Sequence, residues 1–142
     1  MTAQDLGTRP DPRHLRGRHG EEAAAQWLAA EGHTLLAQNL RLGRLEVDLL
    51  SIDPRDGALV LTEVKARRAG RHAPELRVDA AKRRHLVTAA RILLARPPFR
   101  CRPARFDVMA VTLDAAGRPL DLRHLRAAFD ASESRHRRSR IT

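Results

Sequence analysis

The sequence predicts a single α/β domain in which helices flank a mixed β-sheet. The chain has 142 residues, 42% of them apolar, which is enough for one well-packed core. Strand-forming and helix-forming segments alternate along it. Turn-forming residues at 53–57 join two apolar strands, which predicts an antiparallel hairpin, while a later strand follows a long helix, which predicts a parallel pair.

The first segments are an arm, a helix and a strand. Residues 1–16 mix Arg, Asp, Pro and Gly without periodicity, so we assign them to a flexible basic arm before a domain that covers 17–130. Residues 21–31 predict a helix because they are rich in alanine and begin with two glutamates, which suit the helix dipole. Gly32 is placed to cap this helix. Residues 33–40 predict an edge strand.

The centre of the chain predicts a hairpin followed by a long helix. The two strands cover 45–52 and 58–66, and a polar loop over 67–77 follows them. Asp79 is a plausible N-cap for a helix over 80–96. This part of the sequence therefore supplies the antiparallel pair and the crossover helix.

The C-terminal third predicts a parallel strand and a short ending. Residues 105–113 form the strand that follows the crossover helix, and residues 120–125 a last short strand. Residues 127–129 predict the start of a closing helix. Residues 131–142 contain four arginines and little apolar content, so we expect a disordered basic tail. The core order is α–β–β–β–α–β.

The charge favours a polyanionic partner. The net charge is +10, and 25 of the 27 basic residues are arginine. With three phenylalanines, one tryptophan and no tyrosine, the chain lacks the aromatic platform that stacks single-stranded bases, so nucleic acid would be held through phosphates and shape. The alternative is a ribosome-adjacent or merely soluble basic protein.

Several classes of protein are excluded or disfavoured. The single cysteine, Cys101, excludes a disulfide framework and a cysteine-rich zinc module. No apolar run reaches 18 residues and no secretory signal is visible, so we expect a cytoplasmic protein without a membrane partner.

Three charged residues in the apolar hairpin form the candidate catalytic site. Asp48 interrupts the first strand, and Glu63 and Lys65 end the second on one face of it. If the residue numbers of each cross-strand pair in this hairpin sum to 111, Asp48 lies directly opposite Glu63. A five-residue loop at 53–57 makes the paired numbers sum to 110, which puts the two side chains on opposite faces of the hairpin. A six-residue loop, or a bulge near Asp48, brings Asp48 and Glu63 opposite each other again.

Two carboxylates on one patch repel each other, and a divalent cation relieves this repulsion. Few carboxylates with space for water suit Mg²⁺ or Mn²⁺, and a neighbouring lysine would stabilise charge on water or phosphate. These residue types predict phosphodiester hydrolysis. The alternative interpretation is a set of weak, exposed ion pairs.

The sequence also resembles the YraN family of uncharacterised bacterial proteins, which are predicted endonucleases similar to Holliday junction resolvases and to PD-(D/E)XK nucleases. The resemblance covers about residues 17–130. It is carried by five short segments in order, which are Gly17–Ala24, Asn39–Arg41, Glu46–Leu50, Glu63–Arg67 together with Lys82, and Arg105–Val108. The chain departs from the family at Leu45, where the family usually has glycine.

The resemblance implies a restriction-endonuclease-like αβββαβ fold. It implies that Asp48 and Glu63 bind the metal, that Lys65 assists the attacking water, and that Glu21 joins them from the first helix. We therefore expect an endonuclease that acts with Mg²⁺ or Mn²⁺ on structured or branched DNA. Two-site cutting of a junction would need a homodimer.

Other charged residues have two interpretations each. Glu46 is either an additional ligand or an exposed residue at a strand start. Lys82, Arg83 and Arg67 are candidates to bind nucleic acid, or a solvated basic face. We expect Asp107 to pair with Arg105 in a structural role.

Two further functions stay open at this point. The chain is alternatively a nucleic-acid-binding protein that keeps the nuclease fold without its chemistry. A weaker third reading is an assembly factor for an RNA–protein particle.

Overall fold

The computed structural model describes residues 12–70 and 76–131, so most of the predicted N-terminal arm (1–11) and of the C-terminal tail (132–142) lies outside the described residues. Within these described residues, two helices, a 3₁₀ turn and five strands follow one another. In order they are α1 (Pro12–Ala30), β1 (Thr34–Leu42), β2 (Leu45–Ile52), β3 (Leu59–Arg68), α2 (Ala80–Leu94), η2 (Pro97–Phe99), β4 (Ala104–Leu113) and β5 (Pro119–Phe129).

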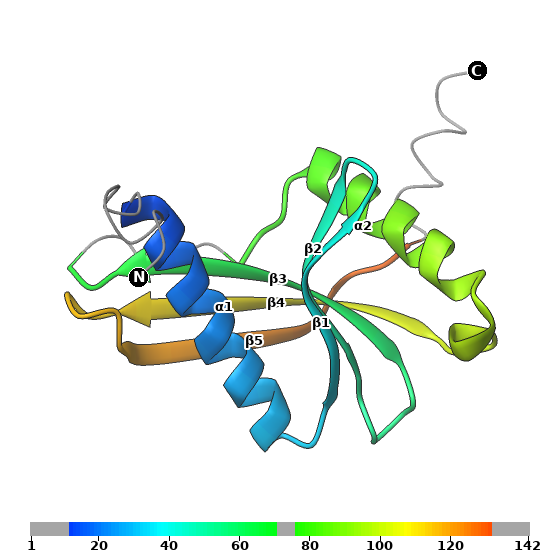
Figure 1. The fold of residues 1–142 in the computed structure, drawn as a ribbon, viewed down its shortest axis with the longest axis horizontal. Coiled ribbons are helices and arrows are strands. Elements are labelled where there is room, and N and C mark those ends of the chain that lie inside the picture. The colour runs from blue at the N-terminus through cyan, green and yellow to red at the C-terminus, as the bar shows by residue number, and fades with distance from the viewer. Residues whose placement is uncertain (1–11, 71–75, 132–142) are drawn as a thin grey trace, which may run out of the picture.

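The five strands form one mixed sheet in the order β1-β2-β3-β4-β5 (Figure 1). Strands β3 and β4 are parallel, and every other neighbouring pair is antiparallel. The antiparallel hairpin, the parallel crossover and the mixed sheet predicted from the sequence are therefore confirmed. The core order is αβββαβ, with β5 added at the edge next to β4.

The register between β2 and β3 decides where the candidate site forms. Leu49 pairs with Thr62 and Ile52 with Leu59, so paired positions sum to 111. The connection spans residues 53–58, because the Asp53 amide donates to the Ala58 carbonyl at 3.1 Å and closes a six-residue loop. This is the longer of the two loops considered above. The pairing ends at Leu49, and beyond it β2 turns away from β3 (Figure 1).

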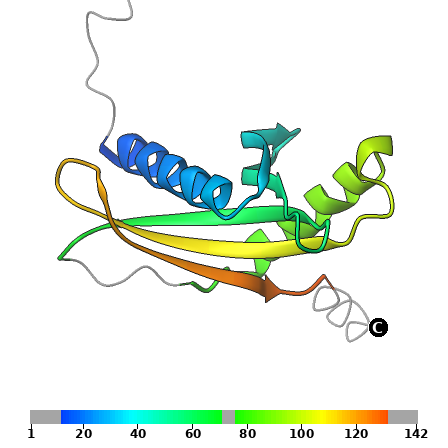
Figure 2. The same ribbon diagram turned by 90° about the horizontal axis from the view of Figure 1, so that it is seen from below.

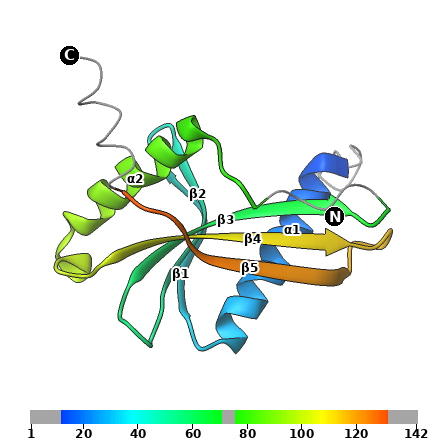
Figure 3. The same cartoon turned by 180° about the vertical axis from the view of Figure 1, so that it is seen from behind.

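The two helices cover opposite faces of the sheet. Figure 2 shows α1 lying along one face of β3, β4 and β5, and α2 comes to the front only in the reverse view of Figure 3. Each helix has its own apolar cluster. Leu28 of α1 packs with Met109 and Val111 of β4, whereas Leu86 of α2 packs with Leu61 of β3.

Gly20 allows α1 to lie close to β3. A Cβ atom built at this position would lie 2.6 Å from the Cβ of Ala66, which is closer than side-chain atoms approach one another. The helix therefore touches the strand directly here. The next residue along the helix is Glu21, so this contact also fixes how far Glu21 lies from the strands.

Both helices end within two residues of the predicted position, but α1 begins earlier. Asp79 caps α2 by accepting the Lys82 amide at 2.8 Å, and Gly32 follows α1 with φ +92°. Helix α1 begins at Pro12 rather than near residue 21, because proline fits the first turn of a helix, where its missing N–H is not needed. Of the described helices, neither is long and apolar enough to cross a membrane.

The predicted closing helix at 127–129 is wrong, because β5 continues to Phe129. The Phe129 ring stacks on the Phe106 ring with centroids 4.8 Å apart, and the Ala127 amide donates to Asp107 Oδ1 at 3.1 Å. These contacts with β4 outweigh the helix preference of the two alanines. The chain adapts at Ala127, where φ is +50°.

Candidate active site

The candidate site forms where β2 and β3 separate. Asp48 lies one residue beyond the last pair of the ladder, and its Oδ2 accepts the backbone N–H of Val64 at 2.8 Å. The side chain thus bonds to the amide of a neighbouring strand at the point where the backbone pairing has ended. Asp48 also shares a hydrogen bond with the carboxyl of Glu63. We call Asp48 and Glu63 the acid pair.

Burial and mutual repulsion keep the acid pair from ionising fully. The Glu63 side chain is 17% exposed. Burial first, and then the negative charge of Asp48, raise the pKa of Glu63 to about 7. Burial also raises the pKa of Asp48, although the bond from the Val64 amide opposes this. Both groups therefore resist ionisation, and Glu63 is only partly ionised near neutral pH.

One oxygen of the acid pair lacks a well-aligned donor. Glu63 Oε2 is buried and accepts no hydrogen bond of good geometry. Lys82 Nζ lies 3.5 Å from this atom and donates to the Glu46 carbonyl at 3.3 Å. Lys82 thus reaches from the first turn of α2 across to β2 and β3. Its positive charge lowers the pKa of both acids but does not cancel the effect of burial.

Glu21 joins the same group of charges from α1. Burial raises its pKa, and the negative charges of Asp48 and Glu46 act in the same direction. A hydrogen bond from the side chain of Asn39 opposes them. Asn39 adopts a left-handed backbone conformation, with φ +49°, which asparagine tolerates better than most residues. Glu21, predicted only from the family resemblance, therefore lies close enough to interact with Asp48 and Glu46.

The other predicted residues lie around the acid pair without joining it. Lys65 is two residues beyond Glu63 on β3, and its Nζ donates to the carbonyl of Arg77. Arg67 is exposed at the end of β3. Arg83 donates to the Val78 carbonyl at 2.8 Å and lies over the Phe129 ring at 5.7 Å. The structure thus places Lys82, rather than Lys65, beside the carboxylates.

Sequence analysis missed the roles of two residues. Lys82 was predicted to bind nucleic acid, and Asn39 appeared only as part of a family segment. Each contact joins elements far apart in the chain, so neither could be read from local spacing. The preference of the sequence for arginine, which draws attention to both lysines, and the family resemblance were the signals available for Lys82.

Few side chains that could bind a metal ion lie near the acid pair among the described residues. Among residues 15–70 and 76–131, no cluster of three or more His, Cys, Asp or Glu side chains could hold a metal ion. The acid pair offers two carboxyl groups, and one of their oxygens, Glu63 Oε2, lacks a good donor. Chemically, it can take up a proton or exchange that proton for a cation.

A second group of buried charges lies on the strands nearby, and we call it the Arg105 cluster. Arg105 donates to Asp53 at 2.8 Å and to Asp107 at 2.9 Å and 3.0 Å. His124 lies 2.8 Å from Asp107, and His33 lies 3.6 Å from Asp53. Burial opposes ionisation of Asp107, yet the bonds from His124 and Arg105 lower its pKa to about 2. Asp107 and Arg105 pair as the sequence predicts.

The fold and the site define a class of protein. It is an α/β protein with an αβββαβ core and two carboxyl groups where strands β2 and β3 of its central hairpin separate from each other. A family model described as "Uncharacterised protein family UPF0102" matches residues 20–111. The chain belongs to this family, which is the one called YraN above.

Relatives in several bacteria support this membership. A UPF0102 protein of Oleidesulfovibrio alaskensis is 41% identical over 130 residues, which cover 90% of this chain and 63% of the relative. UPF0102 protein STH1475 of Symbiobacterium thermophilum is 42% identical over 81% of this chain and 96% of its own length. A UPF0102 protein of Chromohalobacter salexigens is 44% identical over 82% of this chain and 91% of its own length.

Proposed function

We propose that this protein is a metal-dependent endonuclease that hydrolyses phosphodiester bonds in structured or branched DNA. One observation carries the proposal: Asp48 and Glu63 share a hydrogen bond in a buried position where strand pairing has ended. Two buried carboxyls in contact destabilise each other when ionised, so they favour an environment that supplies positive charge. The net charge of +10 agrees with a polyanionic substrate.

The residues of the acid pair fit Mg²⁺ or Mn²⁺. These ions bind through one or two carboxylates and keep several waters, so a cluster of three or more protein ligands is not required. Glu63 Oε2, which is buried without a well-aligned donor, is the kind of atom a cation would satisfy. Asp48 and Glu63 would hold the ion. Such an ion lowers the pKa of bound water and stabilises charge on a phosphate oxygen.

The surrounding residues would position the substrate and the proton. Asp48 is held in place by the Val64 amide, which fixes its carboxylate relative to β3. Glu21 has a raised pKa and lies close to the acid pair, so it is suited to exchange a proton there. Lys65 lies on the same face of β3 as Glu63, where its ammonium would stabilise charge that develops on the phosphate.

A second candidate function is a nucleic-acid-binding protein without chemistry. The observation that favours it is the position of Lys82, whose ammonium lies 3.5 Å from Glu63 Oε2. An ammonium there supplies part of the positive charge that a metal ion would otherwise bring. In that case the acid pair and Lys82 would compensate one another's charge and have a structural role, without a bound metal ion.

Calorimetric titration with Mn²⁺, combined with a cleavage assay on four-way junctions and on linear duplex, tests the proposal. We expect the wild-type chain to bind Mn²⁺ and cut DNA, and Glu63→Gln and Asp48→Asn to lose both activities, with cleavage falling at least about a hundredfold. Glu22→Gln is the matched control, because Glu22 is an exposed glutamate on α1 next to Glu21. Salt-sensitive DNA binding without Mn²⁺ binding would favour the second candidate.

A further inference from the structure

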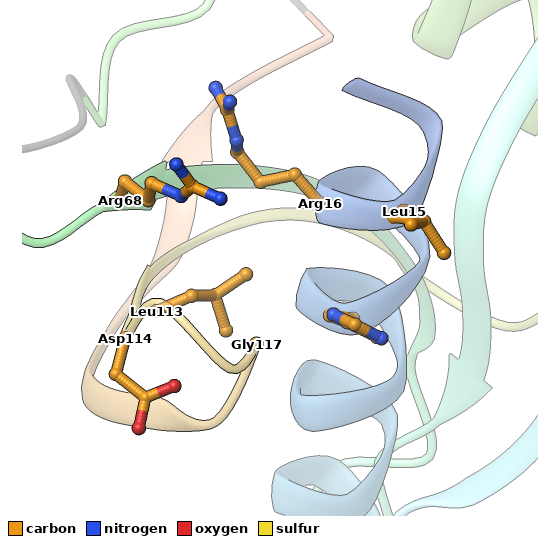
Figure 4. A pocket seen from close by; sticks show the side chains of 7 residues that line it. Leu15, Arg16, Arg68, Leu113, Asp114 and Gly117 are labelled. Carbon is orange, nitrogen blue, oxygen red and sulfur yellow. The ribbon is translucent and has the colours of Figure 1, made fainter. Parts of the chain in front are cut away.

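A small cavity lies between the start of α1 and the far end of β3. Its volume is about 80 Å³, which is room for several waters or one tetrahedral anion. Helix α1 contributes Leu15, Arg16 and His19, and Arg68 comes from the end of β3. The turn between β4 and β5 closes the remaining side (Figure 4). None of these residues belongs to the acid pair or contacts it.

The cavity is positively charged, and its charge is not balanced from within. Figure 4 shows the guanidinium groups of Arg16 and Arg68 extending over the same side of the cavity. Neither group has a carboxylate at salt-bridge distance among the described residues; Arg16 is half-buried and Arg68 is exposed. Two cations that converge without an acid between them repel each other and are stabilised by an anion.

The one carboxylate at the cavity is occupied elsewhere. Asp114 Oδ1 accepts the backbone N–H groups of Ala116 and Arg118 at 2.9 Å and 2.8 Å, so this acid holds its own turn together. In Figure 4 it points away from the two arginines. It therefore leaves the arginines free to bind an external anion.

The turn is built to come close to His19. Gly117 has φ +82°, and a Cβ atom there would lie 2.1 Å from His19 Nδ1. Only glycine permits this approach. The imidazole therefore forms part of the wall of the cavity and adds a third nitrogen donor beside the two arginines.

We propose that this cavity is a second phosphate-binding site, which holds a phosphate of the nucleic-acid strand outside the cleavage site. Guanidinium groups match the geometry of phosphate oxygens and bind them in pairs, and His19 adds one more donor. The identification of the phosphate as part of a nucleic acid rests on the proposed function. The presence of a phosphate site does not.

The cavity and the candidate active site share two elements of the fold. Arg68 is five residues beyond Glu63 on β3, and this odd separation directs the two side chains to opposite faces of the sheet, Arg68 to the face that α1 covers. Arg16 is five residues before Glu21 on α1, about 7 Å along the helix axis. Two of the three elements that bring a carboxyl group to the candidate active site, α1 and β3, thus also bring an arginine to the cavity.

Two measurements on the full chain in chelator test this proposal. The first is an NMR titration with inorganic phosphate at constant ionic strength. We expect saturable shifts of the His19 and Gly117 amide signals, and an increase of about tenfold or more in the phosphate Kd for the variant Arg16→Ala/Arg68→Ala. Arg123→Ala is the control, since Arg123 is an exposed arginine on β5 away from the cavity.

The second measurement is the salt dependence of duplex DNA binding without divalent ions. Loss of one phosphate contact lowers the slope of log K against log salt concentration by about 0.9, so we expect this change in Arg16→Ala/Arg68→Ala and no change in Arg123→Ala. If the double variant does not fold, Arg68→Lys provides the comparison. It keeps the charge but loses the paired geometry, and should weaken phosphate binding severalfold.

The outcomes separate this proposal from the proposed function. If the arginine variants show the slope change but the wild-type chain fails to cut DNA, the phosphate site is supported and the proposed nuclease activity is contradicted. Amide shifts that do not saturate with phosphate, or that persist unchanged in the arginine variants, would contradict the proposal that the cavity binds phosphate. Saturable phosphate binding with no effect of the variants on the DNA slope would overturn its assignment to a nucleic-acid strand.

Discussion

Two groups of buried carboxylates share the same sheet but are stabilised in opposite ways. In the Arg105 cluster, one guanidinium bonds to both Asp53 and Asp107, and the pKa of Asp107 falls to about 2. In the acid pair, the carboxyl groups of Asp48 and Glu63 contact each other, and the pKa of Glu63 rises to about 7. Burial opposes ionisation in both places, so the difference comes from the partners.

The comparison sets a group of charges that is balanced internally against one that is not. The Arg105 cluster contains its own countercharge and joins the 53–58 loop to β4 and β5. The acid pair lacks full compensation, since Lys82 approaches but does not lower the pKa of Glu63 to its ordinary value. Buried charges without compensation reduce stability, and proteins retain such groups mainly at sites of binding or catalysis.

The largest effect is expected from Arg105→Met, which removes the countercharge of the structural cluster. Asp53 and Asp107 would then remain buried without their cation, and the free energy of unfolding should fall by about 3 to 5 kcal/mol. Urea denaturation at pH 7 measures this change. Arg102→Met is a suitable control, because Arg102 bonds to the Gly57 carbonyl and to no carboxylate among the described residues. An equal loss in both variants would show that the carboxylates do not matter.

An intermediate effect is expected from pH, and its sign differs between the two groups. The pKa of Asp107 is below its ordinary value of 3.8, so its contribution to stability is present above pH 3.8 and is lost as the pH falls toward 2. The pKa of Glu63 is raised from 4.5 to about 7, so its contribution is present below pH 4.5 and is lost as the pH rises through 7.

Chelator-treated protein unfolded by denaturant between pH 3 and pH 8 should show both trends. Glu63→Gln should remove a decline on the order of 2 kcal/mol between pH 4.5 and pH 7, and Asp107→Asn should flatten the acidic side of the profile. A Glu63→Gln profile that still falls over this range would mean that another group carries the change.

The smallest effect on stability is expected from Lys82→Met. Lys82 is 28% exposed on its side chain, and the free energy of unfolding should change by less than about 1 kcal/mol. The pKa of Glu63 should rise further, because Lys82 lowers it. If the ammonium competes with a metal ion, Mn²⁺ should bind severalfold more tightly by calorimetry. Weaker Mn²⁺ binding would instead show that Lys82 helps to organise the site.

The sequence predicted the elements that depend on local patterns. The hairpin, the cap at Asp79 and the parallel strand follow from alternation, turn residues and the length of the crossover. The register summing to 111 was one of two alternatives, and the length of the 53–58 loop, closed by the bond between the Asp53 amide and the Ala58 carbonyl, selected it. That bond belongs to the folded loop and has no sequence signature.

The parts that could not be predicted depend on contacts between distant segments. Lys82 follows Glu63 by 19 positions and reaches it only because α2 packs beside β2 and β3. The end of β5 has helix-forming alanines, but the stacking of Phe129 on Phe106 decides its conformation. In both cases tertiary packing outweighs the local preference.

The absence of a side chain at position 20 couples packing to chemistry. Gly20 meets Ala66 with no space to spare, and Glu21 is the next residue along the helix. The size of the Ala66 methyl group therefore sets how near Glu21 can come to Asp48 and Glu63. A larger side chain at position 66 would push α1 away from β3. Such a substitution offers a way to change the separation of these acids without altering any charged residue.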